Sequence, residues 1–188
     1  MSKAKSILKH WLPLALMTTA FCGLVYAAVQ QSLRQGANDP QIQLAEDSAD
    51  ALARGEPVES VVPIATIDVA RSLAPFMMVF DDNGATLASS GLLHGQVPAL
   101  PAGVLDYVQQ HGEDRVTWQP EPGVRVAAVV VRYTGTNSGY ILAGRSLREV
   151  EKRESQVSFF AGATWLSTLI VTLILGVLSE HLLSDSHR

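Results

Sequence analysis

Two long uncharged apolar blocks dominate the pattern of hydrophobic and polar positions along the chain. The first runs from Trp11 to Gln30 and the second from Val157 to Leu178, and neither contains a charged residue. A helix rises about 1.5 Å per residue, so each block is long enough to cross a hydrocarbon core of about 30 Å. In that core the backbone has no water to bind, and a helix satisfies its polar groups internally. The pattern predicts two transmembrane helices.

The first apolar block has a second interpretation, as a cleaved signal peptide. Lys3, Lys5 and Lys9 form a basic segment before it, and Val25-Tyr26-Ala27 resembles a signal-peptidase site. The apolar stretch is longer than an ordinary signal core, which favours an uncleaved helix. Under both interpretations the segment that follows is translocated.

Basic residues near the ends predict the orientation. Three lysines and no acid precede Trp11, which favours a cytoplasmic N-terminus. Four basic residues between positions 145 and 153 oppose this orientation, but long loops cross largely regardless of their charge. We therefore expect a two-span protein of the bacterial cytoplasmic (inner) membrane, with residues 1–10 and 179–188 inside and residues 31–156 outside.

The segment between the membrane helices begins with a helical pattern. A helix is expected from Pro40 to about Arg54, with Asp39 as its N-cap and Gly55 as its stop. Its narrow apolar stripe either packs on the same domain or forms a coiled-coil seam with a second chain. The stripe consists of Ile42, Ala45, Ala49 and Leu52.

A hairpin follows that helix. We expect a short helix at 68–73 and then a buried strand at 75–80. Its turn is Asp81-Asp82-Asn83-Gly84, where Asn-Gly supplies the positive φ angles of a tight hairpin turn. The return strand covers 85–89, and residues 91–98 are expected to be a loop.

The second half of the domain is predicted to hold one helix and three strands. The helix begins at Pro101 and ends at Gly112. The strands are expected at 115–118, 124–133 and 140–144, and the second is so apolar that it should be central. A polar helix from Ser146 leads into the second membrane block. The predicted fold class is therefore α/β (α+β), with an antiparallel sheet and flanking helices.

Charge and motif content limit the chemistry of this domain. Residues 31–156 hold ten Lys and Arg against sixteen Asp and Glu, and an acidic domain argues against nucleic acid as a partner. The single cysteine, Cys22, lies in the first apolar block and excludes an intrachain disulfide. His94 and His111 lack the spacing of a metal site, and the turn at 81–84 lacks the alternating ligands of a calcium loop. We expect no enzyme activity, no metal and no cofactor.

The order of elements resembles the single Cache (PAS-like) sensor domains of bacterial receptors with two membrane spans. The shared order is membrane helix, helix, strand pair, helix, three strands, helix and membrane helix, and the hairpin Phe80-Asp81-Asp82-Asn83-Gly84 is its most typical piece. The resemblance implies an antiparallel sheet of about five strands that cups a small ligand outside the membrane. Such receptors continue into a cytoplasmic output module, whereas ten residues follow Leu178 here, and we expect no room for one.

The resemblance places a ligand pocket on the last three strands. The polar and aromatic residues there are Trp118, Arg125, Arg132, Tyr133 and Tyr140. Strand alternation puts Arg125 on the face of Val129 and Arg132 on the face of Val130. An arginine that faces a pocket would bind a carboxylate in a bidentate pair. The alternative is that each arginine is solvated at a strand end or pairs with a surface acid.

The membrane helices carry small and hydroxyl residues. Thr19, Gly23 and Ala27 recur at a spacing of four, as do Ser158 and Gly162. Small residues at this spacing let two helices of one chain, or of two chains, approach closely.

Together these features predict a membrane-anchored, sensor-like regulatory subunit. Its expected partners are the lipid bilayer, a membrane protein or a second copy, and a small-molecule ligand. Two alternatives stay open. One is a structural or accessory subunit of a membrane complex without a ligand, and the other is a receptor remnant.

Overall fold

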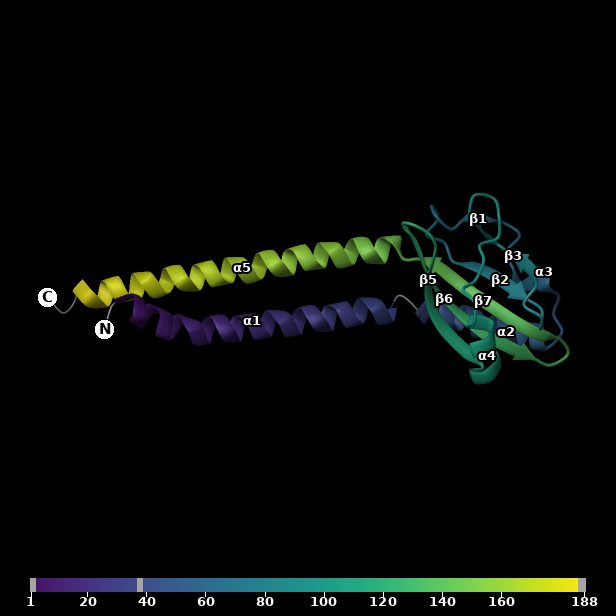
Figure 1. Cartoon of the computed structure of the whole chain (residues 1–188), viewed down its shortest axis with the longest axis horizontal. Helices are drawn as coiled ribbons and strands as arrows, with labels where there is room; N and C mark the ends of the chain where they lie inside the picture. Colours follow the sequence, from purple (N-terminus) through teal and green to yellow (C-terminus); the bar gives the residue numbers. More distant parts are fainter. Residues whose placement is uncertain (1–2, 37–38, 186–188) are drawn as a thin grey trace. The chain divides into compact units, whose positions relative to one another are not determined.

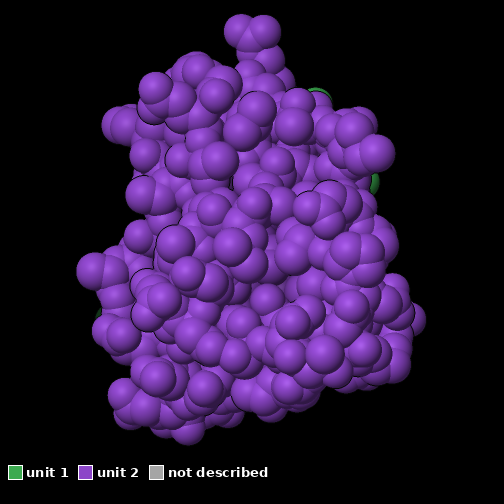
Figure 2. Space-filling model, turned by 90° about the vertical axis from the view of Figure 1, so that its right-hand side faces the viewer, with its two compact units in different colours: residues 1–33, 152–188 green, residues 34–151 purple. Residues whose placement is uncertain are grey.

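The computed structural model describes residues 3–36 and 39–185. The chain divides into two compact units, the terminal helices (residues 1–33 and 152–188) and a folded domain, Arg34–Glu151, which is purple in Figure 2.

The first unit consists of two long helices, α1 (Lys3–Gly36) and most of α5 (Arg148–Asp185). Both are long and apolar enough to cross a membrane, over Lys5–Leu33 and Arg148–Ser179. Only 6% and 0% of their most apolar windows are buried inside the protein, unlike core helices of soluble proteins. So much exposed apolar surface requires lipid or protein cover. The helices therefore fit the predicted two-span membrane protein.

The domain is built on a five-stranded antiparallel sheet with the order β3-β2-β7-β6-β5 (Figure 1). The strands are β2 (Phe76–Phe80), β3 (Thr86–Ser89), β5 (Glu113–Glu121), β6 (Val124–Thr134) and β7 (Ser138–Ser146). The expected α+β fold with this sheet is confirmed. The apolar run in β6 belongs to an inner strand between β7 and β5, although the middle strand of the five is β7 and not β6 as predicted.

Side-chain alternation gives the sheet two packed faces. Helix α2 (Asp39–Ala53) covers one face, which carries Val79, Val129 and Ile141. Helix α4 (Val104–His111) packs with the other face, whose buried residues include Met78 and Leu142. We call these the α2 face and the α4 face.

The apolar stripe of α2 packs on its own domain. Ala45, Ala49 and Leu52 are buried, and α2 contacts both β6 and β7. The backbone amide of Thr136, in the β6–β7 turn, donates to the carbonyl of Ala53 at the end of the helix. Of the two alternatives for this stripe, packing on the same domain is confirmed. The buried side chains that would form a coiled-coil seam contact the sheet instead of a second chain.

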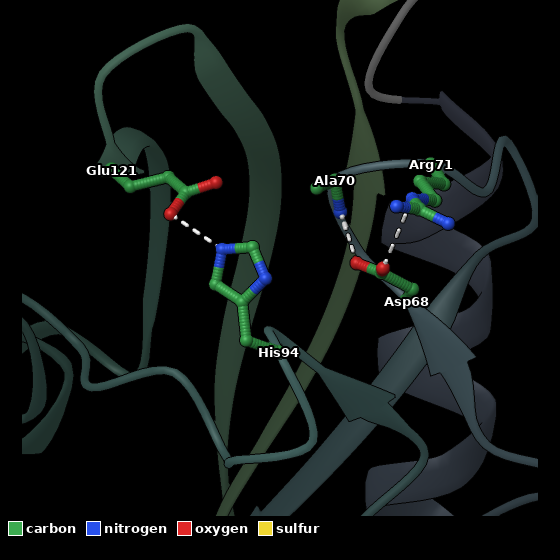
Figure 3. Close-up of polar contacts among 5 residues, drawn as sticks. All are labelled: Asp68, Ala70, Arg71, His94 and Glu121. Atoms are coloured by element: carbon green, nitrogen blue, oxygen red, sulfur yellow. Dashed lines mark hydrogen bonds and ion pairs between the residues drawn. The ribbon is translucent and has the colours of Figure 1, made fainter.

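The prediction of a short helix at 68–73 is wrong. Residues Ile67–Asp68 form strand β1, which pairs in parallel with β4 (Gly91–Leu92) inside the segment expected to be a loop. A single turn follows, in which the carboxylate of Asp68 accepts from the amide of Ala70 at 3.0 Å (Figure 3). Pro75 disfavours helical geometry in the residue before it, so the turn does not extend. A four-residue helix, α3 (Val58–Val61), lies between α2 and β1.

The β2–β3 turn differs from the expected Asn-Gly turn. Gly84 has φ = 80°, while Asn83 is not among the described residues with positive φ. The turn spans 81–85, with the Gly84 amide donating to the Asp81 carbonyl. The Asp81 carboxylate accepts from the amides of Asn83 and Ala85 at 2.9 and 2.7 Å. Because this carboxylate organises the turn, a two-residue turn with two positive φ angles is not needed.

Candidate functional site

The five residues predicted to line a pocket lie on both faces of the sheet. Trp118 and Tyr140 belong to the buried cluster of the α4 face, and Tyr133 belongs to that of the α2 face. Arg132 contacts α4, and Arg125 contacts the first turn of α5. Arg125 was expected on the face of Val129 and Arg132 on the face of Val130. The buried clusters agree, because Val129 belongs to the α2 face and Val130 to the α4 face. The five residues do not converge on one site.

Trp118 and Tyr140 fill the interior of the α4 face. Their exposed fractions are 6% and 3%, and the Trp118 ring meets the Phe76 ring edge-on with centroids 6.4 Å apart. Trp118 Nε1 is buried and has no hydrogen-bond partner among the described residues. Trp118 and Tyr140 are therefore packed in the core of this face.

Arg132 binds carbonyl groups at the carboxyl end of α4. Its Nη1 donates to the carbonyl of Gln109 at 3.3 Å, and its backbone amide donates to the carbonyl of Gly112 at 2.9 Å. A cation here interacts favourably with the negative end of the helix dipole. His111 has a similar role, because its Nδ1 lies 2.9 Å from the Tyr107 carbonyl oxygen and its ring stacks on Tyr107.

Tyr133 belongs to a polar cluster where the β2–β3 and β6–β7 turns meet. Burial, then the charges of Asp82 and Asp81, raise the pKa of the Tyr133 phenol. Ser138 donates a short hydrogen bond to Asp82. At neutral pH the phenol stays protonated, so this cluster tethers two turns rather than supplying a base.

A groove of about 440 Å³ opens between the β2–β3 hairpin and the start of α4. Its walls are the segment 97–103, the hairpin residues Phe80, Gly84 and Thr86, and Leu105 and Asp106 of α4. The volume is in the range of small-molecule sites. The sequence does not predict this groove, because its walls come from two stretches, 80–86 and 97–106, that only the fold brings together.

A histidine–carboxylate contact lies on the loop after β4. His94 Nε2 is 2.8 Å from a carboxylate oxygen of Glu121 at the end of β5 (Figure 3). The contact joins the loop to the β5–β6 turn. His94 has φ = 52°, an uncommon backbone conformation for a residue other than glycine. The Leu93–Gln96 bridge and this contact together hold the loop in place.

The first turn of α5 is attached to β6. Arg125 Nη1 donates to Glu151 Oε1 at 2.6 Å, and the amide of Leu147 donates to the Arg125 carbonyl at 2.9 Å. Leu147 is the one residue between β7 and α5. Glu151 was not singled out from the sequence, because an acid in a first helical turn is common.

No protein-family model matches the chain, and no curated protein matches it either. The fold and the contacts of the described residues are therefore the basis for a functional proposal. Among these features, the contacts of Arg125 within the domain hold the start of α5, the helix that contains the second apolar block.

Proposed function

We propose that the protein is a membrane-anchored, sensor-like regulatory subunit that acts through a partner in the bacterial cytoplasmic membrane. The Cache-like domain lies outside the cytoplasm, and a ligand or a partner contact on it changes the position of α5. The protein that responds to this change is another membrane protein or a second copy of the chain.

The observation that carries this proposal is the continuity of β7, Leu147 and α5. The helix begins at Arg148 and continues without interruption to Asp185, through the whole second apolar block. Arg125 contacts the Glu151 side chain in the first turn of the helix and the backbone amide of Leu147 just before it. In this proposal a shift of the sheet moves the start of the helix, whereas a flexible linker in place of the helix would absorb the change.

The energetics of this attachment suit a switch. The Arg125 and Glu151 side chains are 50% and 38% exposed, and such a pair contributes at most about 1 kcal/mol. A ligand shifts a two-state equilibrium by as much as its affinity differs between the two states. A contact this weak can be broken by a modest differential affinity, while the sheet stays folded.

A second candidate function is a structural or accessory subunit without a ligand. The filled interior of the α4 face favours it, because Trp118 and Tyr140 occupy the expected pocket. In that case the domain is a docking surface, and the groove beside Asp106 binds nothing or binds a partner segment.

We expect Glu151→Arg to change the activity of the partner severalfold. A photo-reactive amino acid at Leu166, which is 53% exposed on α5, would capture the partner in native membranes for identification by mass spectrometry. The partner's own activity is then compared after reconstitution with wild type, with Glu151→Arg, and with the charge swap Arg125→Glu/Glu151→Arg.

The charge swap is the matched control, since it restores an ion pair in opposite polarity. A regulatory subunit requires that the swap return the partner's activity towards wild type. If all three proteins give equal capture and equal partner activity, the chain is an accessory subunit and the regulatory proposal fails.

A further inference from the structure

Among the described residues, three hydrogen bonds join α1 to α5 within the pair of apolar helices. Each links an aromatic side chain of one helix to a hydroxyl of the other. The pairs are Trp11–Thr172, Trp165–Thr19 and Tyr26–Ser158, at 3.1, 3.0 and 3.0 Å. We call them the inter-helix bridges.

The hydroxyls of all three bridges are oriented in the same way by their own helix. Each donates its hydrogen to the carbonyl four residues earlier. The donor–acceptor pairs are Thr19 to Ala15, Ser158 to Glu154 and Thr172 to Thr168, at 2.8, 2.8 and 2.9 Å. A lone pair is left to accept from the other helix, so the phenol of Tyr26 is the donor to Ser158. The same arrangement, a hydroxyl that donates to its own helix and accepts from the other, therefore recurs at three positions along the helix pair.

The spacing of the bridges fits one antiparallel register. The participating positions step by eight and seven residues along α1 and by seven and seven, in the opposite direction, along α5. Seven residues are about two helical turns, so the bridges return to the same side of each helix. Three separate hydrogen-bonded pairs thus agree on one register. A stripe of small residues would only allow the helices to approach and would not specify a register.

Sliding one helix past the other would disrupt this register. A displacement of one turn places Ala15 or Gly23 of α1 opposite Trp165, and neither residue has a side-chain acceptor. In hydrocarbon an indole N–H without an acceptor is costly, because no water replaces the lost partner. The glycines do not set the distance between the helices, since a Cβ at Gly23 or Gly162 would meet nothing within 4 Å.

We propose that the three inter-helix bridges form a register lock that pairs the two membrane spans of one chain at a single axial position. The lock requires only that α1 remain uncleaved beside α5. It operates under either candidate function, and it assigns a positioning role to Thr19, Ser158 and Thr172.

The native cysteine provides a direct probe of the register. Cys22 of α1 and Ala161 of α5 both line the two grooves that flank the contact, which measure about 400 and 310 Å³. In a chain carrying Ala161→Cys, a membrane-permeant oxidant should form an intrachain disulfide with Cys22. We expect it to form at least tenfold faster than with Phe159→Cys, whose position is 72% exposed. Cys22→Ser/Ala161→Cys is the chemical control.

The lock itself is tested by removing its acceptors. The variant Thr19→Val/Ser158→Ala/Thr172→Val keeps the shape of each side chain nearly unchanged. Val157→Cys lies one turn from Ala161 and reports a displaced register. We expect its disulfide yield relative to Ala161→Cys to rise several-fold in the variant. Protease resistance of the domain and membrane content of the full-length chain verify that the variant is folded.

Three results would overturn the proposal. An unchanged ratio between positions 157 and 161 would show that the bridges do not set the register. Equal rates at Phe159→Cys and Ala161→Cys would show that the spans do not face each other in this way. A product of dimer size as the main species would place the contact between chains instead of within one.

Discussion

Replacing Gly144 by valine is expected to unfold the domain. A Cβ at this position would lie 2.6 Å from Cζ of Phe76, which is 1% exposed. The ring has little room to shift, because a Cβ at Gly91 would also lie 2.3 Å from Cδ2 of the same ring. Overpacking a core costs about 1–3 kcal/mol, occasionally more, and we expect about 3 kcal/mol for alanine here and a larger loss for valine.

Urea-dependent proteolysis of the full-length protein in detergent measures this loss as a change in the free energy of unfolding. Gly36→Ala is the control, since its Cβ would meet nothing within 4 Å. Phe76→Leu in the Gly144→Ala background should recover part of the loss, so that the two substitutions are less than additive. Full additivity would mean that the ring and the glycine do not compete for space.

Substituting Trp118 by alanine is expected to cost about 4 kcal/mol, while phenylalanine costs about 1 kcal/mol. Alanine removes a large side chain from the α4 face and leaves a cavity beside Phe76. Phenylalanine keeps most of the ring and deletes Nε1, a donor without a partner among the described residues. No hydrogen bond within the described protein is lost, so its effect is confined to packing.

The same proteolysis measurement compares the two variants with Arg115→Ala, a half-exposed position on the same strand that should change stability little. The comparison also tests whether Trp118 binds a ligand. If phenylalanine destabilises the protein isolated from its native membrane as strongly as alanine does, Nε1 is engaged by a bound molecule. That outcome would support the prediction that Trp118 is a site residue.

The elements that follow from strong local patterns were predictable. The uncharged blocks predict the two long apolar helices, and the apolar run of β6 predicts an inner strand of the sheet. The segment at 68–73 was mistaken for a helix, because β1 is only two residues long and its partner β4 lies more than twenty residues away. Such short strands depend on tertiary pairing, which a local pattern does not encode.

The candidate site was harder to predict for a different reason. Alternation predicts which side chains share a face, and it is consistent with where Arg125 and Arg132 lie. Whether that face encloses a cavity depends on the volumes of side chains from several strands, here Trp118, Tyr140 and their neighbours. The inter-helix bridges could not be predicted either. The sequence shows the hydroxyl residues, but it does not show the register of the two helices.

The location of the domain is the central claim, because a sensor-like subunit of this kind must place Arg34–Glu151 outside the cytoplasm. Ile64 is 94% exposed, so Ile64→Cys in a Cys22→Ser background gives a single reactive thiol on the domain surface. A membrane-impermeant maleimide is applied to spheroplasts, and Ser2→Cys in the same background reports the N-terminus. We expect labelling at position 64 in intact spheroplasts and at position 2 only after lysis. The reverse pattern would place the domain in the cytoplasm and contradict this account.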